Sequence, residues 1–406
     1  MLTLGRADGT LLRLLPRVTQ APRTRSPTLG PRLARVWGWA ALVALLLAAA
    51  GAPAEEIRIE VARGKPLAHF SGEAATASEG TQGAPLAISA GPAHVLAARG
   101  ESLSLDGARV QPPLVIKPGS APLFFEGKAL PGRIEIWAEQ GGLVVVNALD
   151  LEEYVSAVVS SEMPAKWPAA ALEAQSIAAR TYAVAQKISS GPGARAHLGA
   201  SVLDQVYAGA AHPESGARAA AKATYGEVLT WNAAPIAAYF SASCGGKSES
   251  AEGAFDVAPG STPYLPVQDD GDFDAGDPRV RWTVRIPLAQ LGKTLRVAGR
   301  LRAELTGLEV SETTASGRAR KVALRAGGKT VTMRGAELRQ LVGYNKLPSL
   351  AFTVEVEKHE AVFRGSGSGH GVGLCQWGAR GRAEAGQTAQ QILAHYYPGA
   401  EIRQMY

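Results

Sequence analysis

The stretch from Pro168 to Ile188 constrains the fold most, because it is a long run of helix-forming residues with a recognisable start and end. Proline suits the first position of a helix, and Gly191 stands where glycine commonly follows the last turn. Side chains recur at helical spacing at Leu172, Gln175, Ala179 and Tyr182. Small residues, mostly alanine, dominate the run. We therefore predict a helix over 168–188 that packs closely against its neighbours.

Shorter elements are predicted on both sides of this helix. Alternating polar and apolar residues indicate strands at 56–61 and 281–286, and glycine turns at 140–142 and 326–328 indicate two hairpins. A short helix is predicted to begin at Asp150, with further helices at 215–224, 336–342 and 388–396, and strands at 227–231 and 236–241. The stretch Leu265–Pro278 carries five aspartates and is predicted to be a solvated loop or linker.

These elements indicate an α+β fold. We expect a mixed domain with the alanine-rich helix and short strands, an inserted β-rich subdomain and a β-rich N-terminal region. The predicted segments are 1–54 (signal peptide or N-terminal anchor), 55–147 (β-rich N-terminal region), 148–280 (first part of the mixed domain), 281–356 (inserted β-rich subdomain) and 357–406 (C-terminal part of the mixed domain).

The first 54 residues differ in composition from the rest of the chain. Seven arginines and one aspartate come with an apolar run, Val36–Ala50, and the small-x-small sequence Ala52-Pro53-Ala54 precedes Glu55. This pattern predicts a secretory signal peptide, or an uncleaved anchor, and therefore an exported protein of the periplasm or cell wall. Much of the formal net charge of +6 lies here. The remainder is close to balanced, which argues against nucleic acid as a partner.

One glutamate, Glu162, lies just ahead of the long helix, between Ser161 and the run Met163-Pro164, with Trp167 close behind. Apolar neighbours raise the pKa of a carboxyl, and a carboxyl that is protonated near neutral pH can act as a general acid. The structural interpretation is that a glutamate near a helix N-terminus interacts favourably with the helix dipole. Composition alone favours the structural interpretation.

A second group of candidate residues lies near two glycine-rich runs. His370 lies within 365–373, followed by Gln376 and Trp377, and the segment 239–246 combines hydroxyls with Cys244. Dense glycine lets the backbone approach a ligand closely, and an amide beside an indole ring suits sugar binding. A serine or cysteine nucleophile paired with His370 is conceivable, although no third group to orient the histidine is evident. Two thiols in an exported chain indicate one disulfide; two free thiols, or a partial metal site that includes His370, are the alternatives.

Taken in order, several runs resemble the SpoIID/LytB family, named for stage II sporulation protein D and the LytB amidase enhancer. The resemblance covers roughly Ala148 to the C-terminus, with the inserted subdomain only loosely alike. The matching runs are Leu151–Val155, Ser161–Pro164 with Trp167-Pro168, Glu173–Tyr182, Asp204–Gly209, Tyr239–Ser243, Gly367–Gly378 and His395–Gly399.

The resemblance implies a lytic transglycosylase that cleaves peptidoglycan glycan strands, preferably peptide-stripped ones, between MurNAc and GlcNAc and leaves 1,6-anhydroMurNAc ends. Glu162 maps onto the catalytic acid, and Arg180 maps onto a required helix arginine that holds the lactyl carboxylate or orients Glu162. The residues expected to bind the glycan are Tyr207, Tyr239, Ser241, Ser243, His370, Gln376 and Trp377.

The resemblance also bears on cofactors and cysteines. The family often has glycine where Cys244 stands and serine where Cys375 stands, so the two cysteines predict a disulfide that ties the glycine-rich loop to the strand end. Some members carry zinc in the loop before Asp204. Here that loop offers His197 and no cysteine, so neither a metal nor any other cofactor is expected.

Two other functions compete with this one. A non-catalytic amidase enhancer would bind glycan strands or an N-acetylmuramoyl-L-alanine amidase without cleaving anything. A glycosidase with Asp204 as second carboxylate would give reducing ends instead of anhydro ends. A cell-wall amidase is a possible partner in either case, and a membrane is expected to be contacted only through an uncleaved N-terminal segment.

Overall fold

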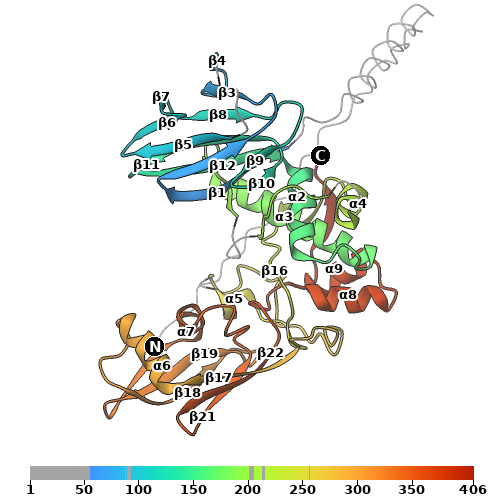
Figure 1. The fold of residues 1–406 in the computed structure, drawn as a ribbon. Helices are drawn as coiled ribbons and strands as arrows, with labels where there is room; N and C mark the ends of the chain where they lie inside the picture. The colour runs from blue at the N-terminus through green and yellow to red at the C-terminus, as the bar shows by residue number, and fades with distance from the viewer. Residues whose placement is uncertain (1–54, 87, 89–92, 201–204, 213–214, 256) are drawn as a thin grey trace, which may run out of the picture. The chain divides into compact units, whose positions relative to one another are not determined.

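The computed structural model describes residues 55–406 apart from 87, 89–92, 201–204, 213–214 and 256 (Figure 1). The predicted export segment, residues 1–54, and Asp204 lie outside the described residues. Helices and several separate sheets make up the described part, which confirms the predicted α+β class. None of the described helices is long and apolar enough to cross a bilayer.

The N-terminal region consists of two sheets around one hydrophobic core. Their strand orders are β13-β1-β12-β11-β8-β3-β4 and β10-β9-β2-β5-β6-β7. The predicted hairpin is β11–β12, joined by Gln140 and Gly141 at φ 49° and 81°, which is the left-handed conformation that a tight hairpin turn needs. The bounds are β1 (Glu56–Lys65), β2 (Leu67–Ser71), β3 (Thr76–Glu79), β4 (Pro85–Leu86), β5 (His94–Arg99), β6 (Ser102–Leu105), β7 (Ala108–Val110), β8 (Leu114–Lys117), β9 (Leu123–Phe125), β10 (Lys128–Leu130), β11 (Arg133–Glu139), β12 (Gly142–Asp150) and β13 (Leu198–Gly199).

Three helices follow the last long strand of this region. Helix α2 (Leu151–Glu162) begins at Asp150, whose carboxylate accepts from the backbone N–H groups of Glu152 and Glu153. Helix α3 (Ala169–Ser190) confirms the long helix predicted from sequence, and Gly191 at φ 75° ends it. Helix α4 (Gly216–Ala223) begins at Ser215, as predicted.

Helix α3 is buried on two sides, which explains its small residues. Leu172 and Tyr182 belong to the core shared with the N-terminal sheets, whereas Ala174 and Ile177 belong to a second core formed by the C-terminal part of the chain. The helix contacts α4, α8, α9 and β14. A helix that is enclosed on both sides has to be apolar nearly all round, and alanine lets neighbours pack closely.

The second core gathers short elements from both ends of the mixed domain. Strand β16 pairs in parallel with β23, which brings residue 241 beside residue 375. A strand was predicted over 236–241, but only its last two residues form one, because the preceding backbone bonds locally in tight turns. Helix α8 was not predicted. The bounds are β14 (Glu227–Trp231), β15 (Ala234–Pro235), β16 (Phe240–Ser241), α5 (Ala251–Ala254), β23 (Leu374–Cys375), α8 (Gln376–Glu384), α9 (Ala389–Tyr396) and β24 (Glu401–Gln404).

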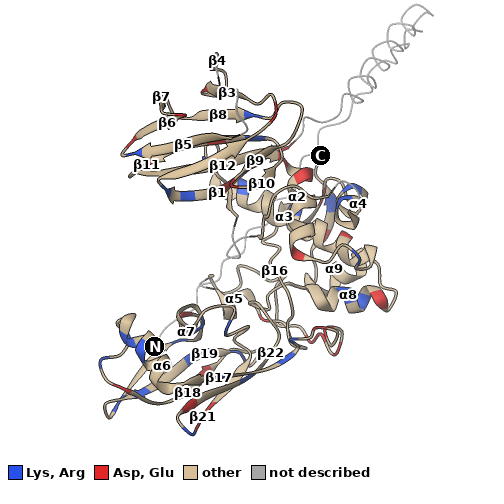
Figure 2. Cartoon of the chain, viewed as in Figure 1, with Lys and Arg blue, Asp and Glu red and all other residues tan. Residues whose placement is uncertain are grey.

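The inserted segment has its own hydrophobic core, which runs from Ile286 to Phe363. The predicted hairpin is β19–β20, with Gly327 and Gly328 both at positive φ in its turn. The strands of the inserted segment carry acidic and basic residues side by side (Figure 2). One example is the ion pair between Arg285 and Glu357, at 3.1 Å. The bounds are β17 (Arg281–Pro287), α6 (Leu288–Val297), β18 (Leu305–Thr313), β19 (Ala319–Ala326), β20 (Lys329–Arg334), α7 (Gly335–Val342), β21 (Phe352–Glu357) and β22 (Glu360–Ser366).

The aspartate-rich stretch 265–278 departs from its prediction as a solvated loop. Asp270 and Asp274 are each only 1% exposed, and Asp277 is 5% exposed. Buried carboxylates need partners, and these have them: Arg382 and Tyr396 bond Asp270, while Ser243 and two backbone N–H groups bond Asp274. The acidic composition of this stretch predicted that it is exposed to solvent. The partners that allow its burial come from segments far away in the sequence, which composition does not reveal.

Candidate functional site

Glu162 is the last residue of α2, and Met163 caps the helix end before the chain continues toward α3. Its Oε1 accepts a hydrogen bond from the backbone N–H of Val206 (3.0 Å), and its Oε2 accepts one from the side-chain amide of Gln376 (3.1 Å). Burial raises the pKa of the Glu162 carboxyl above its ordinary value, although these two donors oppose the shift. The negative end of a helix dipole also disfavours a carboxylate. The structural interpretation assumed a helix N-terminus, and the position of Glu162 at a C-terminus removes it.

Gln376 brings three helices together at this carboxyl. It is the first residue of α8 and is buried, and Cys375 caps the helix by accepting from the N–H of Gly378. The Gln376 amide lies 3.5 Å from the Oε1 of Gln175, a fully buried residue of α3. Glu162 at the end of α2 is therefore held by α8 directly and by α3 through one further amide.

Two tryptophans and an arginine lie next to these residues in the sequence and contact one another. The rings of Trp167 and Trp377 meet edge to face with centroids 4.8 Å apart. The guanidinium of Arg380 lies 5.0 Å from the centre of the Trp377 ring and 5.5 Å from that of Trp167, within cation–π range. All three side chains are half-buried, so part of each faces solvent. We call these three residues the aromatic–arginine cluster.

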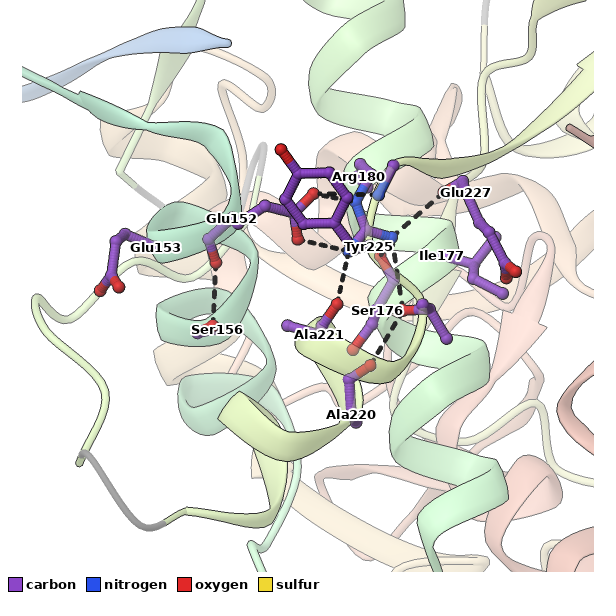
Figure 3. Close-up of polar contacts among 12 residues, drawn as sticks. Glu152, Glu153, Ser156, Ser176, Ile177, Arg180, Ala220, Ala221, Tyr225 and Glu227 are labelled. Carbon is purple, nitrogen blue, oxygen red and sulfur yellow. Dashed lines mark hydrogen bonds and ion pairs between the residues drawn. The ribbon is translucent and has the colours of Figure 1, made fainter. Parts of the chain in front are cut away.

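Arg180 lies on α3 and has no exposed surface. Its guanidinium bonds both carboxylate oxygens of Glu152 (2.7 and 2.6 Å) and the carbonyls of Ala221 and Glu227, both at 3.1 Å (Figure 3). A side chain enclosed in this way cannot reach a glycan carboxylate, and its partners lie at the start of α2, whereas Glu162 is at the end. These contacts tie α3 to the start of α2, the helix whose last residue is Glu162.

Several residues expected to bind glycan have partners inside the protein. The hydroxyl of Tyr207 donates to Asn147 (2.6 Å), and that of Ser243 donates to Asp274 (2.8 Å). Ser241 accepts from the N–H of Gly371 at 3.1 Å. All three residues are buried. In this conformation they hold the loops around the site, whereas Gln376 bonds Glu162 and Trp377 is part of the aromatic–arginine cluster.

His370 and Tyr239 form a second aromatic group with Phe255. The His370 ring lies 5.3 Å from Phe255 and 6.1 Å from Tyr239, centroid to centroid, and its Nδ1 accepts from the N–H of Val372. Burial lowers the pKa of His370 to about 4, so the ring is neutral near neutral pH. The sulfur of Cys244 donates instead to Asp270, at 3.2 Å. The nucleophile–histidine pair considered from sequence is therefore not assembled by these contacts.

Cys244 and Cys375 are close together, but both are free thiols, so the predicted disulfide is not formed in this structure. Both are buried, and the N–H of Cys244 donates to the Cys375 sulfur at 3.2 Å. The parallel pairing of β16 with β23 brings the two segments together, as the disulfide prediction required. The two sulfurs are not bonded to each other; they make hydrogen bonds with backbone N–H groups and carboxylates instead.

Three contributors to the site were not predicted from sequence. The Val206 N–H carries no side-chain signal at all. Arg380 could have been found by placing Gln376–Glu384 on a helix, but its two glycines, Gly378 and Gly381, concealed that helix. Trp167 is near Glu162 in the sequence, but its contact with Trp377 depends on a segment far along the chain. Both glycines are required by packing: a Cβ on Gly378 would lie 2.1 Å from the Tyr396 hydroxyl, and one on Gly381 would lie 2.1 Å from the carbonyl of Phe273.

Fold and site together define an α+β protein in which two neutral donors hold Glu162, and one of them, Gln376, directly precedes Trp377 of the aromatic–arginine cluster. Comparison with known proteins agrees with this class. Residues 139–231 match the family model of stage II sporulation protein, and residues 267–373 match a domain of unknown function (DUF8618).

Full-length relatives extend the match. The chain is 30% identical to stage II sporulation protein D of Bacillus subtilis, over 63% of this chain and 75% of that protein. It is 33% identical to an uncharacterized protein of Brachyspira hyodysenteriae, over 64% of this chain and 68% of that one. It is also 30% identical to the amidase enhancer of Bacillus subtilis, of which it spans only 39%. The chain belongs to the stage II sporulation protein D family, which confirms the resemblance noted from the motifs.

Proposed function

We propose that this chain is an exported peptidoglycan lytic transglycosylase in which Glu162 is both general acid and general base. The observation that carries the proposal is the carboxyl of Glu162, whose pKa is raised by burial at the end of α2 while Val206 and Gln376 fix both of its oxygens. A carboxyl protonated near neutral pH is the group that must deliver a proton to a leaving sugar oxygen.

The chemistry needs one carboxyl when the sugar supplies its own nucleophile. Protonated Glu162 gives its proton to the oxygen between MurNAc C1 and the GlcNAc, and the C1–O bond breaks. The Glu162 carboxylate then takes the proton of the MurNAc 6-hydroxyl as that oxygen bonds to C1, which closes the 1,6-anhydro ring. Glu162 is protonated again, and no water is consumed. A hydrolase would require a second carboxylate to activate water or attack C1.

Binding is assigned to the groups that retain exposed surface. Sugar rings present C–H faces that pack on indole rings, so Trp377 and Trp167 are proposed to carry a sugar next to Glu162. The lactyl carboxylate of MurNAc needs a cation. Arg180 is enclosed, so we assign this contact to Arg380, which is half-buried over both tryptophan rings. Tyr239 and His370 are proposed to line the next part of the glycan path. The buried Tyr207, Ser241 and Ser243 are proposed to hold the surrounding loops.

The competing function is that of a non-catalytic amidase enhancer, favoured by the 30% identity to the Bacillus subtilis amidase enhancer. An enhancer would use the same tryptophans to hold a glycan strand, with or without a cell-wall amidase, but would not need a protonated Glu162. The two functions differ in their products and not in their binding residues.

The test is product analysis of peptide-stripped glycan strands incubated with the purified full-length chain. We expect strands ending in 1,6-anhydroMurNAc, detected by mass spectrometry, and their loss in Glu162→Gln. The matched control is Glu173→Gln, which changes a half-buried glutamate at the start of α3 in the same way. Glycan that binds but stays intact with the wild type would favour the enhancer. Reducing ends in place of anhydro ends would favour a glycosidase.

A further inference from the structure

A buried cluster beside the site contains three groups that bind metal ions. Cys244, Asp270 and Cys375 come from three separate segments, and their side-chain ligand atoms all lie within 4.8 Å of one another. Each of the three residues is only 1% exposed. We propose that Cys244, Cys375 and Asp270 bind a thiophilic divalent ion of the zinc type.

The spacing of the ligand atoms suits a tetrahedral ion. Bonds of about 2.3 Å to sulfur and about 2.0 Å to oxygen place neighbouring ligands about 3.5 Å apart. The Cys244 sulfur lies 3.2 Å from the Oδ2 of Asp270. The Oδ2 of Asp274 also lies 3.6 Å from the Cys244 sulfur and 3.9 Å from the Cys375 sulfur, but it accepts hydrogen bonds from Ser243, Gly245 and Gly246, so the protein ligands are the two sulfurs and Asp270.

Asp270 is oriented for this task by a second layer of contacts. Its Oδ1 accepts from the guanidinium of Arg382 (2.8 Å), the Tyr396 hydroxyl lies 2.9 Å from both carboxylate oxygens, and His395 lies 3.4 Å from Oδ1. These contacts turn Oδ2 toward the two sulfurs. Carboxylate ligands of metal ions are commonly held in this way by outer hydrogen bonds.

Binding of a divalent ion leaves the net charge of the buried cluster unchanged. Two thiol protons leave to solvent, two sulfur–metal bonds and one oxygen–metal bond form, and no electron is transferred. A divalent ion replaces two protons, so the net charge of the buried region does not change.

The ion would act on the position of α8. Cys375 caps this helix, and the next residue is Gln376, whose amide bonds Glu162. Metal binding would thus fix the helix start that supplies one of the two donors to the carboxyl. The binding itself does not depend on the proposed activity. From the sequence we expected no metal ion; the proposal departs from that expectation because Asp270, predicted to lie in a solvated loop, is buried beside the two cysteines.

The test is titration of the reduced, metal-stripped full-length chain with Co²⁺. We expect one ion per chain, with thiolate-to-cobalt charge-transfer bands and tetrahedral ligand-field bands that Zn²⁺ displaces. X-ray absorption of the zinc-loaded wild type should show two sulfur neighbours with the remainder oxygen or nitrogen, and this needs no variant. Cys244→Ser and Cys375→Ser should abolish the bands, whereas Asp272→Asn, an exposed residue of the same loop, should leave them unchanged.

Three results would overturn the proposal. The first is that the reduced wild type shows no cobalt bands. The second is that the bands persist in both cysteine variants. The third is that the wild type is isolated without metal and with the two sulfurs bonded to each other. Thermal unfolding provides a second readout: Zn²⁺ should raise the melting temperature of the wild type and of Asp272→Asn but not that of a folded Cys375→Ser. Failure of any of these leaves the test of anhydro products unaffected.

Discussion

Arg180 offers the sharpest test of how the site is supported. Replacing it with alanine removes a fully buried guanidinium from Glu152, whose side chain is 16% exposed, and leaves the carbonyls of Ala221 and Glu227 without that donor. Breaking a buried ion pair by removing one partner typically costs about 3–5 kcal/mol. That is a large share of the roughly 5–15 kcal/mol that stabilises a folded domain.

The assay is urea unfolding of Arg180→Ala, Glu152→Ala and the double variant. The double variant should lose less stability than the two single losses added together, because the pair is then removed as a unit. Arg218→Ala is the matched control: Arg218 bonds Glu153 on the same helix at 2.6 and 2.8 Å, but both side chains are about one-third exposed, so about 0–1 kcal/mol is expected. Equal, small losses for Arg180→Ala and Arg218→Ala, with anhydro products abolished only in the former, would refute a positioning part for Arg180 and place it on the substrate.

Three further predictions concern the carboxyl and its supports. Burial raises the pKa of Glu162 in the folded state, so the free energy of unfolding should fall as pH rises from the ordinary carboxyl pKa through the raised one. Urea titrations at several pH values should show this fall in the wild type but not in Glu162→Gln. Gln376→Leu removes a hydrogen bond that lowers the pKa of Glu162, so the alkaline limb of the pH–rate profile should move to higher pH; an unchanged limb would show that this amide does not act on the carboxyl. Gly378→Ala should cost about 1–3 kcal/mol in thermal unfolding, since the added carbon meets the Tyr396 hydroxyl, whereas Gly276→Ala, whose added carbon would make an ordinary 3.5 Å contact, should cost little.

The sequence predicts the local elements well where the signal is local. The long helix, the two glycine-turn hairpins and the capped helices at Asp150, Ser215 and Thr388 all appear, because capping and turn residues act on their immediate neighbours. Helix α8 escaped prediction because its glycines are kept for packing against Tyr396 and Phe273, which a local pattern does not reveal.

The site was predictable in its motifs but not in its geometry. The motif marks Glu162, yet its position at a helix C-terminus and its two donors depend on residues 206 and 376, which lie far along the chain. Arg180 was identified by its motif, but its burial against Glu152 could not be read from spacing. The aspartates of 265–278 gave a misleading signal, because their partners lie in distant segments.

The central claim, that Glu162 holds a proton in the folded protein, is tested most directly by carbon-13 NMR titration of glutamate-labelled full-length chain. The carboxyl signal missing in Glu162→Gln identifies the residue. We predict that it titrates above the ordinary glutamate value of about 4.3, in step with the alkaline limb of anhydro-product formation. A pKa at or below that value would contradict the general-acid mechanism.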